Sequence, residues 1–226
     1  MADEKMLNIE SMPSIKLGFT QMQQDDVNHI NKYIDDNMHR LNDLSYSLVG
    51  QIKQHEKSAQ PEFNLEDEIP KRLSNFFVKL AQEYSAAHPL SETILDNIGH
   101  KEDFVVNRMW SVHSYAGDYN PMHEHGTVSG RGVSMIAFLK VPPQIAELEE
   151  RFVNPGKPQT NLNHGNSGST DGVTQFIWDM NSMFDAPRFQ HPTYAHVYPQ
   201  VGKAVSYTHL RAHETDSYLV CRLLLE

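Results

Sequence analysis

The chain has 226 residues, 39% of them hydrophobic and 21% charged, which is the composition of a globular domain with its own core rather than of a disordered segment. The formal net charge of -10 argues against the phosphate backbone of a nucleic acid as the main partner, and no apolar run approaches the roughly 20 residues of a membrane span. A single cysteine excludes an intramolecular disulfide and a cysteine-built zinc site, and the acidic N-terminus lacks a signal-peptide core, so the simplest location is cytoplasmic.

The first half of the chain predicts two amphipathic helices behind an extended opening segment. Residues 7–20 read as extended, with Pro13 limiting regular structure. Residues 24–41 and 70–87 both place apolar side chains at helical spacing. The apolar stripes are Val27, Ile30, Ile34 and Met38 in the first helix, and Leu73, Phe76, Phe77, Leu80 and Tyr84 in the second. We expect an N-terminal region, residues 1–103, whose helices pack on the outside of a β core.

The stretch 107–142 has two strand-like runs around a turn-rich centre that carries His123, Glu124 and His125. Residues two apart in a strand point to the same face, so the two imidazoles would project together, with Glu124 opposite. Paired imidazoles are the start of a site for a divalent transition metal. The apolar run 133–141 suits a buried strand that would hold the pair rigidly. A solvated turn in a chain with 13 histidines is the alternative interpretation.

After this strand the sequence becomes polar before it returns to strand patterns. Residues 154–172 predict a long loop, which is either a lid over the metal pair or a tolerated surface insertion. Residues 173–178 then read as a strand. His191 and His196 follow, and we expect a structural or surface role for both.

The text NPMHEHG, followed by a small-residue turn and an apolar strand that ends in KVP, resembles the iron(II)- and 2-oxoglutarate-dependent oxygenases. The similarity is to a small branch, common in bacteria and marine phages, that has an N-P-x-H-x-H segment. It covers residues 104–204, in which HVYPQVGKA (196–204) looks like the approach to the family's penultimate core strand. The usual family motif is His-x-carboxylate, whereas this chain has His125 in the carboxylate position.

The resemblance implies a mainly β fold with flanking helices (α+β), whose core at residues 104–204 is a double-stranded β-helix, or cupin-like jelly roll. It implies Fe(II) held by His123, His125 and a distal histidine, with 2-oxoglutarate as co-substrate and dioxygen as oxidant. The reaction would be hydroxylation of a prime substrate that the sequence does not identify. Asn120 and Trp110 are candidates for the pocket wall, with a turn former and a core aromatic as the alternative interpretations.

Two other functions are compatible with the same pattern. A cupin-like metal dioxygenase with three histidines would work without 2-oxoglutarate. A non-catalytic jelly-roll module for binding or for a virion would need no metal. A downstream histidine followed by an arginine or lysine favours the oxygenase, and the lack of a distal histidine favours the binding module.

Residues 205–226 resemble a translated sequencing adapter rather than native protein. The codons GTC TCT TAT ACA CAT CTC CGA GCC CAC GAG encode residues 205–214, and CTC GTA TGC CGT CTT CTG CTT GAA encode residues 219–226, with an unspecified barcode between them. This resemblance implies that the native sequence after Ala204 is missing, with the family's closing strands, distal histidine and 2-oxoglutarate-binding arginine. It removes His213 and Cys221 from the candidate ligands, and we expect the chain to be C-terminally truncated and inactive.

Overall fold

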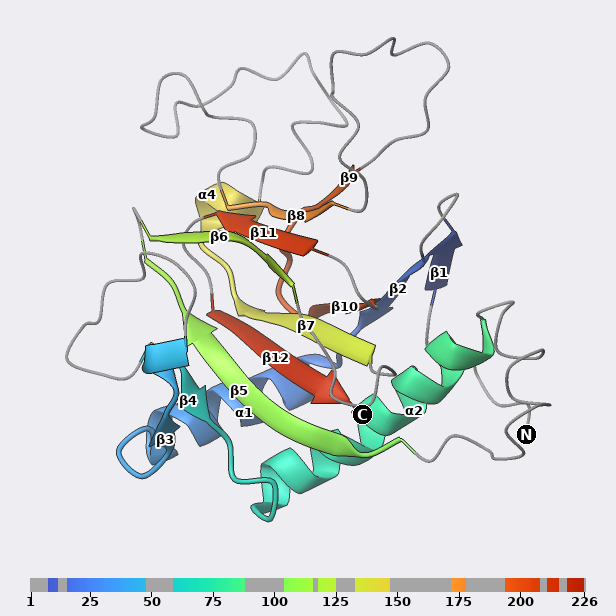
Figure 1. The fold of residues 1–226 in the computed structure, drawn as a ribbon. Coiled ribbons are helices and arrows are strands. Elements are labelled where there is room, and N and C mark those ends of the chain that lie inside the picture. Colours follow the sequence, from blue (N-terminus) through green and yellow to red (C-terminus); the bar gives the residue numbers. More distant parts are fainter. Residues whose placement is uncertain are drawn as a thin grey trace, which may run out of the picture.

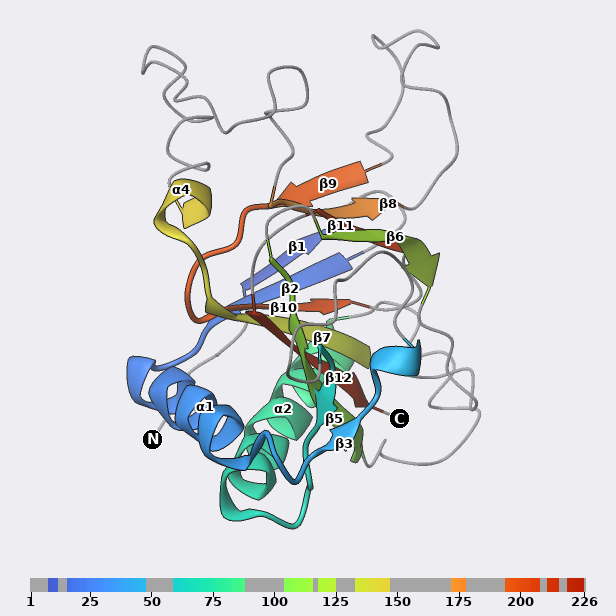
Figure 2. The ribbon, with the colours of Figure 1, turned by 90° about the vertical axis from the view of Figure 1, so that its left-hand side faces the viewer.

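A computed structural model of the chain has three layers, in which two helices cover one face of a large antiparallel sheet and a smaller antiparallel sheet lies on the other (Figure 1). It describes residues 8–11, 16–47, 59–87, 104–115, 118–124, 133–146, 172–177, 194–207, 211–215 and 219–225. Figure 2 shows the same layers from the side, with both helices beyond the larger sheet.

The two helices are α1 (Gln24–Asn37) and α2 (Glu68–Ala86), which confirms the two predicted amphipathic helices. α1 ends earlier than expected, because the side-chain amide of Asn37 donates to the carbonyl of Tyr33 at 2.7 Å and the chain turns there. α2 begins two residues before Pro70. The proline is tolerated because the first four N–H groups of a helix have no partner within it.

The larger sheet has eight strands, all antiparallel to their neighbours. In spatial order they are β1 (Asn8–Ser11), β2 (Lys16–Gln21), β10 (Lys203–Tyr207), β7 (Val133–Lys140), β12 (Leu219–Leu225), β5 (Val106–His113), β4 (Pro61–Glu62) and β3 (Asn42–Asp43). The strands predicted at 104–115 and 133–141 are confirmed as β5 and β7. The extended opening segment forms β1 and β2, and β2 pairs with β10.

The smaller sheet has four antiparallel strands. Their order is β6 (Tyr119–Glu124), β11 (Arg211–Thr215), β8 (Thr174–Ile177) and β9 (Tyr194–Val197). The strand predicted at 173–178 is confirmed as β8. A 3-10 turn, η1 (Ser45–Ser47), and a short helix, α4 (Pro143–Ala146), complete the described elements.

Residues 205–226 supply central strands of both sheets. β12 lies between β5 and β7, and β11 lies between β6 and β8. The connecting residues 208–210 and 216–218 lie outside the described residues. The residues that resemble a translated adapter therefore form the strands that connect the other strands of each sheet. The predicted truncation stays a prediction.

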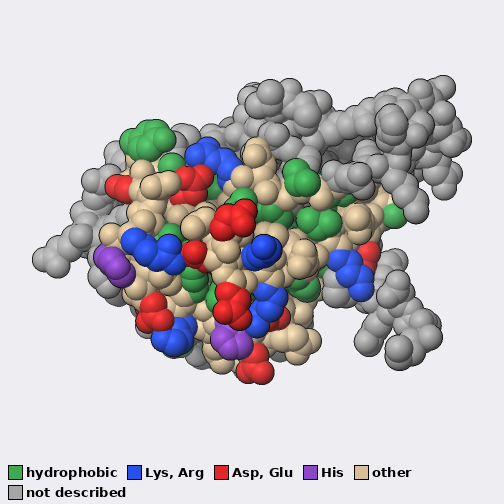
Figure 3. All heavy atoms as spheres, turned by 90° about the horizontal axis from the view of Figure 1, so that it is seen from below, with side chains coloured by type: hydrophobic (Ala, Val, Ile, Leu, Met, Phe, Trp, Pro, Cys, Tyr) green, Lys and Arg blue, Asp and Glu red, His purple; other side chains and the backbone are tan. Residues whose placement is uncertain are grey.

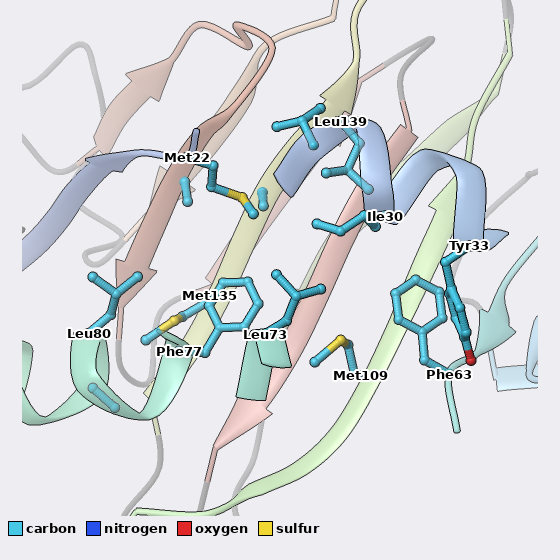
Figure 4. Packing of buried hydrophobic residues seen from close by; sticks show 14 of the residues in the cluster. Met22, Ile30, Tyr33, Phe63, Leu73, Phe77, Leu80, Met109, Met135 and Leu139 are labelled. Atoms are coloured by element: carbon cyan, nitrogen blue, oxygen red, sulfur yellow. The ribbon is translucent and has the colours of Figure 1, made fainter. Parts of the chain in front are cut away.

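Two hydrophobic clusters account for the layers. One fills the space between the helices and the larger sheet, with Ile30 of α1 and Phe77 of α2 packed against Met109 and Met135 (Figure 4). The other fills the space between the two sheets and includes Phe176 of β8. Alternate residues of a strand face opposite sides, so β7 contributes Met135 to the first cluster and its neighbour Ile136 to the second.

The turn into β10 depends on a glycine. Gly202 has φ +84, a left-handed conformation that residues with a Cβ rarely adopt. Its N–H donates to the carbonyl of Phe138 and its carbonyl accepts from the N–H of Met22, both at 2.8 Å. A Cβ at this position would lie 2.4 Å from Nε2 of Gln21. The GK pair of the HVYPQVGKA segment therefore joins β10 to both of its neighbouring strands.

Acidic and basic side chains are interspersed over the outer face of the helices (Figure 3). They include the pairs Lys32–Asp36 at 2.6 Å and Arg72–Asp26 at 2.8 Å. Exposed pairs of this kind contribute about 0–1 kcal/mol each. We therefore interpret this face as a solvated surface.

Candidate metal centre

His123 lies in β6, the edge strand of the smaller sheet. Its backbone is paired with Ala212 of β11, and Ala212 is paired with Phe176 of β8. Phe176 is paired in turn with Ala195 of β9, so these four residues form one row across the sheet. Directly opposite residues in a sheet share a face, so the side chain of Phe176 shows to which face this row belongs.

Phe176 faces the larger sheet. Its side chain is fully buried, and its ring centroid lies 4.8 Å from that of Tyr207 of β10 in an edge-to-face arrangement. It also packs in one cluster with Ile136 and Phe138 of β7. The row that contains position 123 is therefore the inward row, on the side where the two sheets meet.

An irregularity in β6 keeps this register. Asn120 is paired with Glu214 and His123 with Ala212, so three steps along β6 match two steps along β11. The extra residue falls at Pro121 or its neighbour, and a proline suits a bulge because it has no N–H to donate. Asn120, which is buried, and position 123 therefore stay in inward rows despite their odd spacing.

Two hydrogen bonds join Tyr115 to Asp118 just before β6. The backbone N–H of Tyr115 donates to Oδ2 of Asp118 at 2.8 Å, and the N–H of Asp118 donates back to the carbonyl of Tyr115 at 2.9 Å. Asp118 is almost fully buried. These bonds lie just before β6, and Asn120, for which a turn former was the alternative interpretation, lies within this strand and is buried.

The second histidine of the pair, His125, lies outside the described residues. The same holds for His191 and for most of the loop predicted at 154–172. Within the part of the chain that the structure describes, no three histidine, cysteine or acidic residues gather as a metal site. Metal binding by His123 and His125 therefore stays a prediction, and the structure contributes the inward register of position 123.

His196 of β9 has a structural partner that the sequence did not indicate. Its Nε2 lies 3.1 Å from Nε2 of Gln175, the residue directly opposite on β8. Burial lowers the pKa of His196, so the neutral ring accepts the amide hydrogen of Gln175. Gln175 is also paired with His213 of β11, one position away from the row of Phe176. Cross-strand pairing of this kind has no signal in a single sequence.

Trp110 lies on the inward side of the larger sheet. It alternates with Met109, which faces the helices, and its row continues through β12 to Ile136 of the inter-sheet cluster. Its side chain is 8% exposed, and its indole Nε1 has no hydrogen-bond partner among the described residues. The predicted pocket-wall residue thus faces the smaller sheet with an unused donor.

No protein-family model and no curated protein sequence matches this chain. Among solved structures, it is similar to a prolyl-4-hydroxylase from Pseudomonas putida, with a TM-score of 0.54 at 11% identity over 94% of this chain and 93% of that chain. It is also similar to SnoN, a non-heme α-ketoglutarate-dependent epimerase from nogalamycin biosynthesis, with a TM-score of 0.52 at 9% identity over 92% of this chain and 77% of that chain.

At such low identity these similarities show the fold alone. The chain shares its overall fold with a hydroxylase and with an α-ketoglutarate-dependent epimerase, over nearly its whole length. Among the described residues, neither long helix is apolar enough to cross a membrane.

Proposed function

We propose that this chain carries most of the core of a non-haem Fe(II)- and 2-oxoglutarate-dependent dioxygenase that hydroxylates a still unidentified substrate. The fold proposed for that core is a double-stranded β-helix. In support, successive strands from β5 to β12 alternate between the two sheets, except at β8 and β9, which are neighbours in one sheet. A chain that alternates in this way winds two sheets around a shared interior.

The proposed iron ligands from this chain are His123 and His125. The observation that carries the proposal is the inward register of position 123, which lies in the row of Phe176 near the end of β6, where the sequence H-E-H-G begins. If β6 continues by one residue past Glu124, position 125 returns to the same face as position 123. Imidazole nitrogens are good ligands for Fe(II), and a site with few protein ligands leaves positions for a co-substrate.

Iron with 2-oxoglutarate and dioxygen supplies the oxidising chemistry, in which 2-oxoglutarate becomes succinate and carbon dioxide. The chain's own residues would hold and shield the reactants. The apolar cluster around Phe176, Ile136 and Tyr207 closes the space between the sheets beside the His123 row. A closed apolar boundary excludes water and strengthens every polar contact inside it.

The third ligand would come from native residues after Ala204. In support of this part of the proposal, residues 205–226 read as adapter codons, yet β11 and β12 occupy central places in the two sheets. Native strands in these places would pair with β6 and with β5. They would carry the distal histidine and the 2-oxoglutarate-binding arginine. The proposed location of the enzyme is the cytoplasm.

The test uses protein expressed with its native sequence restored after Ala204. We expect this protein to bind one Fe(II) per chain in anaerobic titration and to form succinate from 2-oxoglutarate. His123→Ala and His125→Ala should each lower iron affinity at least tenfold and abolish succinate formation. His39→Ala, which removes an exposed histidine after α1, is the matched control and should change neither. Unchanged turnover in His123→Ala would remove the site assignment.

A further inference from the structure

An extra residue in β6 decides which way the candidate metal ligands face. From Asn120 to His123, β6 takes three steps while β11 takes two. Pro121 and Met122 therefore lie opposite a single residue of β11. In a regular strand, residues three apart lie on opposite faces. Asn120 and position 123 both belong to inward rows only because β6 contains this bulge.

The part of the chain before the bulge is fixed by buried polar residues. Asp118 is almost fully buried, and its carboxylate accepts the N–H of Tyr115. Asn120 is also buried, and it lies in one row with the fully buried Thr174 of β8. Thr174 lies two residues before Phe176, so this row faces inward as well. A change in register would expose these buried polar groups if it moved this part, so it moves the part after the bulge instead.

A regular ladder is the arrangement that the bulge prevents. If β6 paired with β11 one to one after Asn120, Met122 would take the inward row of Phe176. A methionine suits the apolar cluster around that row, so this register is a real competitor. The first histidine would then lie in the outer row that contains Ile177. A shift by one residue turns every later position to the other face, so Glu124 would lie on the inner face in place of the histidines.

The proline at the bulge disfavours the regular ladder. A proline has no N–H for a ladder hydrogen bond, and within sheets it is found at edges and at bulges. β6 is an edge strand that pairs only with β11 among the described strands, and Pro121 is one of the two residues at its bulge. Valine in the same place would supply the missing N–H and has a high preference for strands.

We propose that Pro121 is a positioning residue for the metal site, because it maintains the bulge that turns His123, and with it His125, to the inner face. The effect on iron rests on the proposed function. The face of position 123 is a property of the backbone and needs no metal. The N-P of the N-P-x-H-x-H segment then has a physical reason, since an anchored asparagine and a proline that interrupts the ladder set the face of both histidines.

The first experiment measures the face of each position without metal. It uses the 226-residue chain with Cys221→Ser, which removes its only cysteine, so that His123→Cys or Glu124→Cys introduces a single thiol. A maleimide should react about tenfold faster at position 124 than at position 123, because position 123 lies in the buried row. Pro121→Val should reverse this ratio.

A second change in the same strand separates positioning from a loss of structure. Deletion of Met122 from the Pro121→Val variant should restore the original ratio, because the shortened strand brings position 123 to the inner face without a bulge. Pro143→Val, which changes an exposed proline at the start of α4, is the matched control and should leave the ratio unchanged. An unchanged ratio in Pro121→Val, an equal rise of both rates, or a ratio that the deletion does not restore would overturn the proposal.

The second experiment measures iron in the protein with its native sequence restored after Ala204. Pro121→Val should lower the affinity for Fe(II) about 10- to 100-fold, the range expected for residues that orient metal ligands. Deletion of Met122 from this variant should return most of the lost affinity, and Pro143→Val should leave the affinity unchanged. A simple loss of stability at Pro121 would not be reversed by a deletion beside it.

The positioning role and the proposed function fail separately. If the unaltered protein binds no iron, the proposed function fails, and the labelling ratio alone then shows whether Pro121 sets the face of position 123. If Pro121→Val changes neither the ratio nor the affinity, the positioning role fails and the iron result of the unaltered protein stands. A reversed ratio with unchanged iron affinity would remove both the positioning role and the assignment of His123 as a ligand.

Discussion

At the scale of single residues, Tyr33 joins the two helices through a short polar network. Its hydroxyl donates to Oδ2 of Asp67 at 2.7 Å, and Arg40 donates to the same oxygen. Burial, and then the hydrogen bond to Asp67, raise the pKa of Tyr33 to about 12. The bonds from Tyr33 and Arg40 hold the pKa of the Asp67 carboxyl below its ordinary value. Asp67 immediately precedes α2, so the network fixes the start of α2 against α1.

Tyr33→Phe should therefore destabilise the protein by roughly 1–2 kcal/mol at neutral pH, as a hydrogen bond to a charged acceptor is lost. The pKa of Tyr33 is higher in the folded than in the unfolded chain, so its contribution is fully present below pH 10.0 and is lost as pH rises through about 12. Urea unfolding should show wild type and Tyr33→Phe converging over this alkaline range.

The pKa of Asp67 gives the opposite trend in acid. Because its pKa is lowered in the folded state, its contribution is present above the ordinary value of 3.8 and is lost as pH falls below it. The two proteins should converge there as well. Tyr46→Phe removes the hydroxyl of a tyrosine that is 82% exposed and should leave stability unchanged at every pH. Parallel pH profiles for wild type and Tyr33→Phe would show that the network contributes nothing.

At the scale of elements, α2 is held to the larger sheet by its apolar face. Phe77 is fully buried, its ring centroid lies 5.2 Å from that of Phe76, and it belongs to the cluster that contains Met109 and Met135. Phe77→Ala should lower the free energy of unfolding by about 3–5 kcal/mol, since it removes a buried ring and leaves a cavity. Denaturant unfolding measures this loss.

The matched control lies on the opposite face of the same helix. Asn75→Ala changes an exposed side chain and should shift stability by no more than about 0.5 kcal/mol. A small effect of Phe77→Ala, similar to that of Asn75→Ala, would mean that α2 does not pack on the sheet as described.

The elements that the sequence predicted are those whose signal is local. The stripe through Val27, Ile30 and Ile34 repeats at helical spacing, and the opposite faces of Met109 and Trp110 follow from strand alternation. The elements that it missed depend on partners far along the chain. β3 and β4 have two residues each, too few for any period.

The candidate site divides in the same way. The motif around His123 is visible in the sequence, but its inward register depends on pairing with β11 and on the bulge near Pro121. The bond between Gln175 and His196 requires the register of β8 against β9. The unused donor of Trp110 becomes visible only when its surroundings are known. Pairing register is a property of two strands, so one strand's sequence does not determine it.

At the scale of the whole molecule, the two sheets are closed by strands from residues 205–226. β12 lies between β5 and β7, and β11 is the only described strand that pairs with β6. Cross-strand neighbours contribute roughly 0.2–1 kcal/mol each, so strands in central places affect stability from both sides. If residues 205–226 are encoded by adapter bases, as their codons suggest, they were never selected for these neighbours.

Restoring the native sequence after Ala204 should therefore raise the urea midpoint above that of the 226-residue chain, and it should raise the bound Fe(II) to one per chain. The first change follows from strands whose side chains match both neighbours, and the second from a third ligand beside His123 and His125. Urea unfolding and anaerobic iron titration of both proteins, prepared side by side, measure the two effects. A 226-residue chain that melts cooperatively with stoichiometric iron would instead show that residues 205–226 are themselves competent closing strands. His213 would then have to be tested as a ligand, although its register places it opposite Gln175 rather than in the row of Phe176.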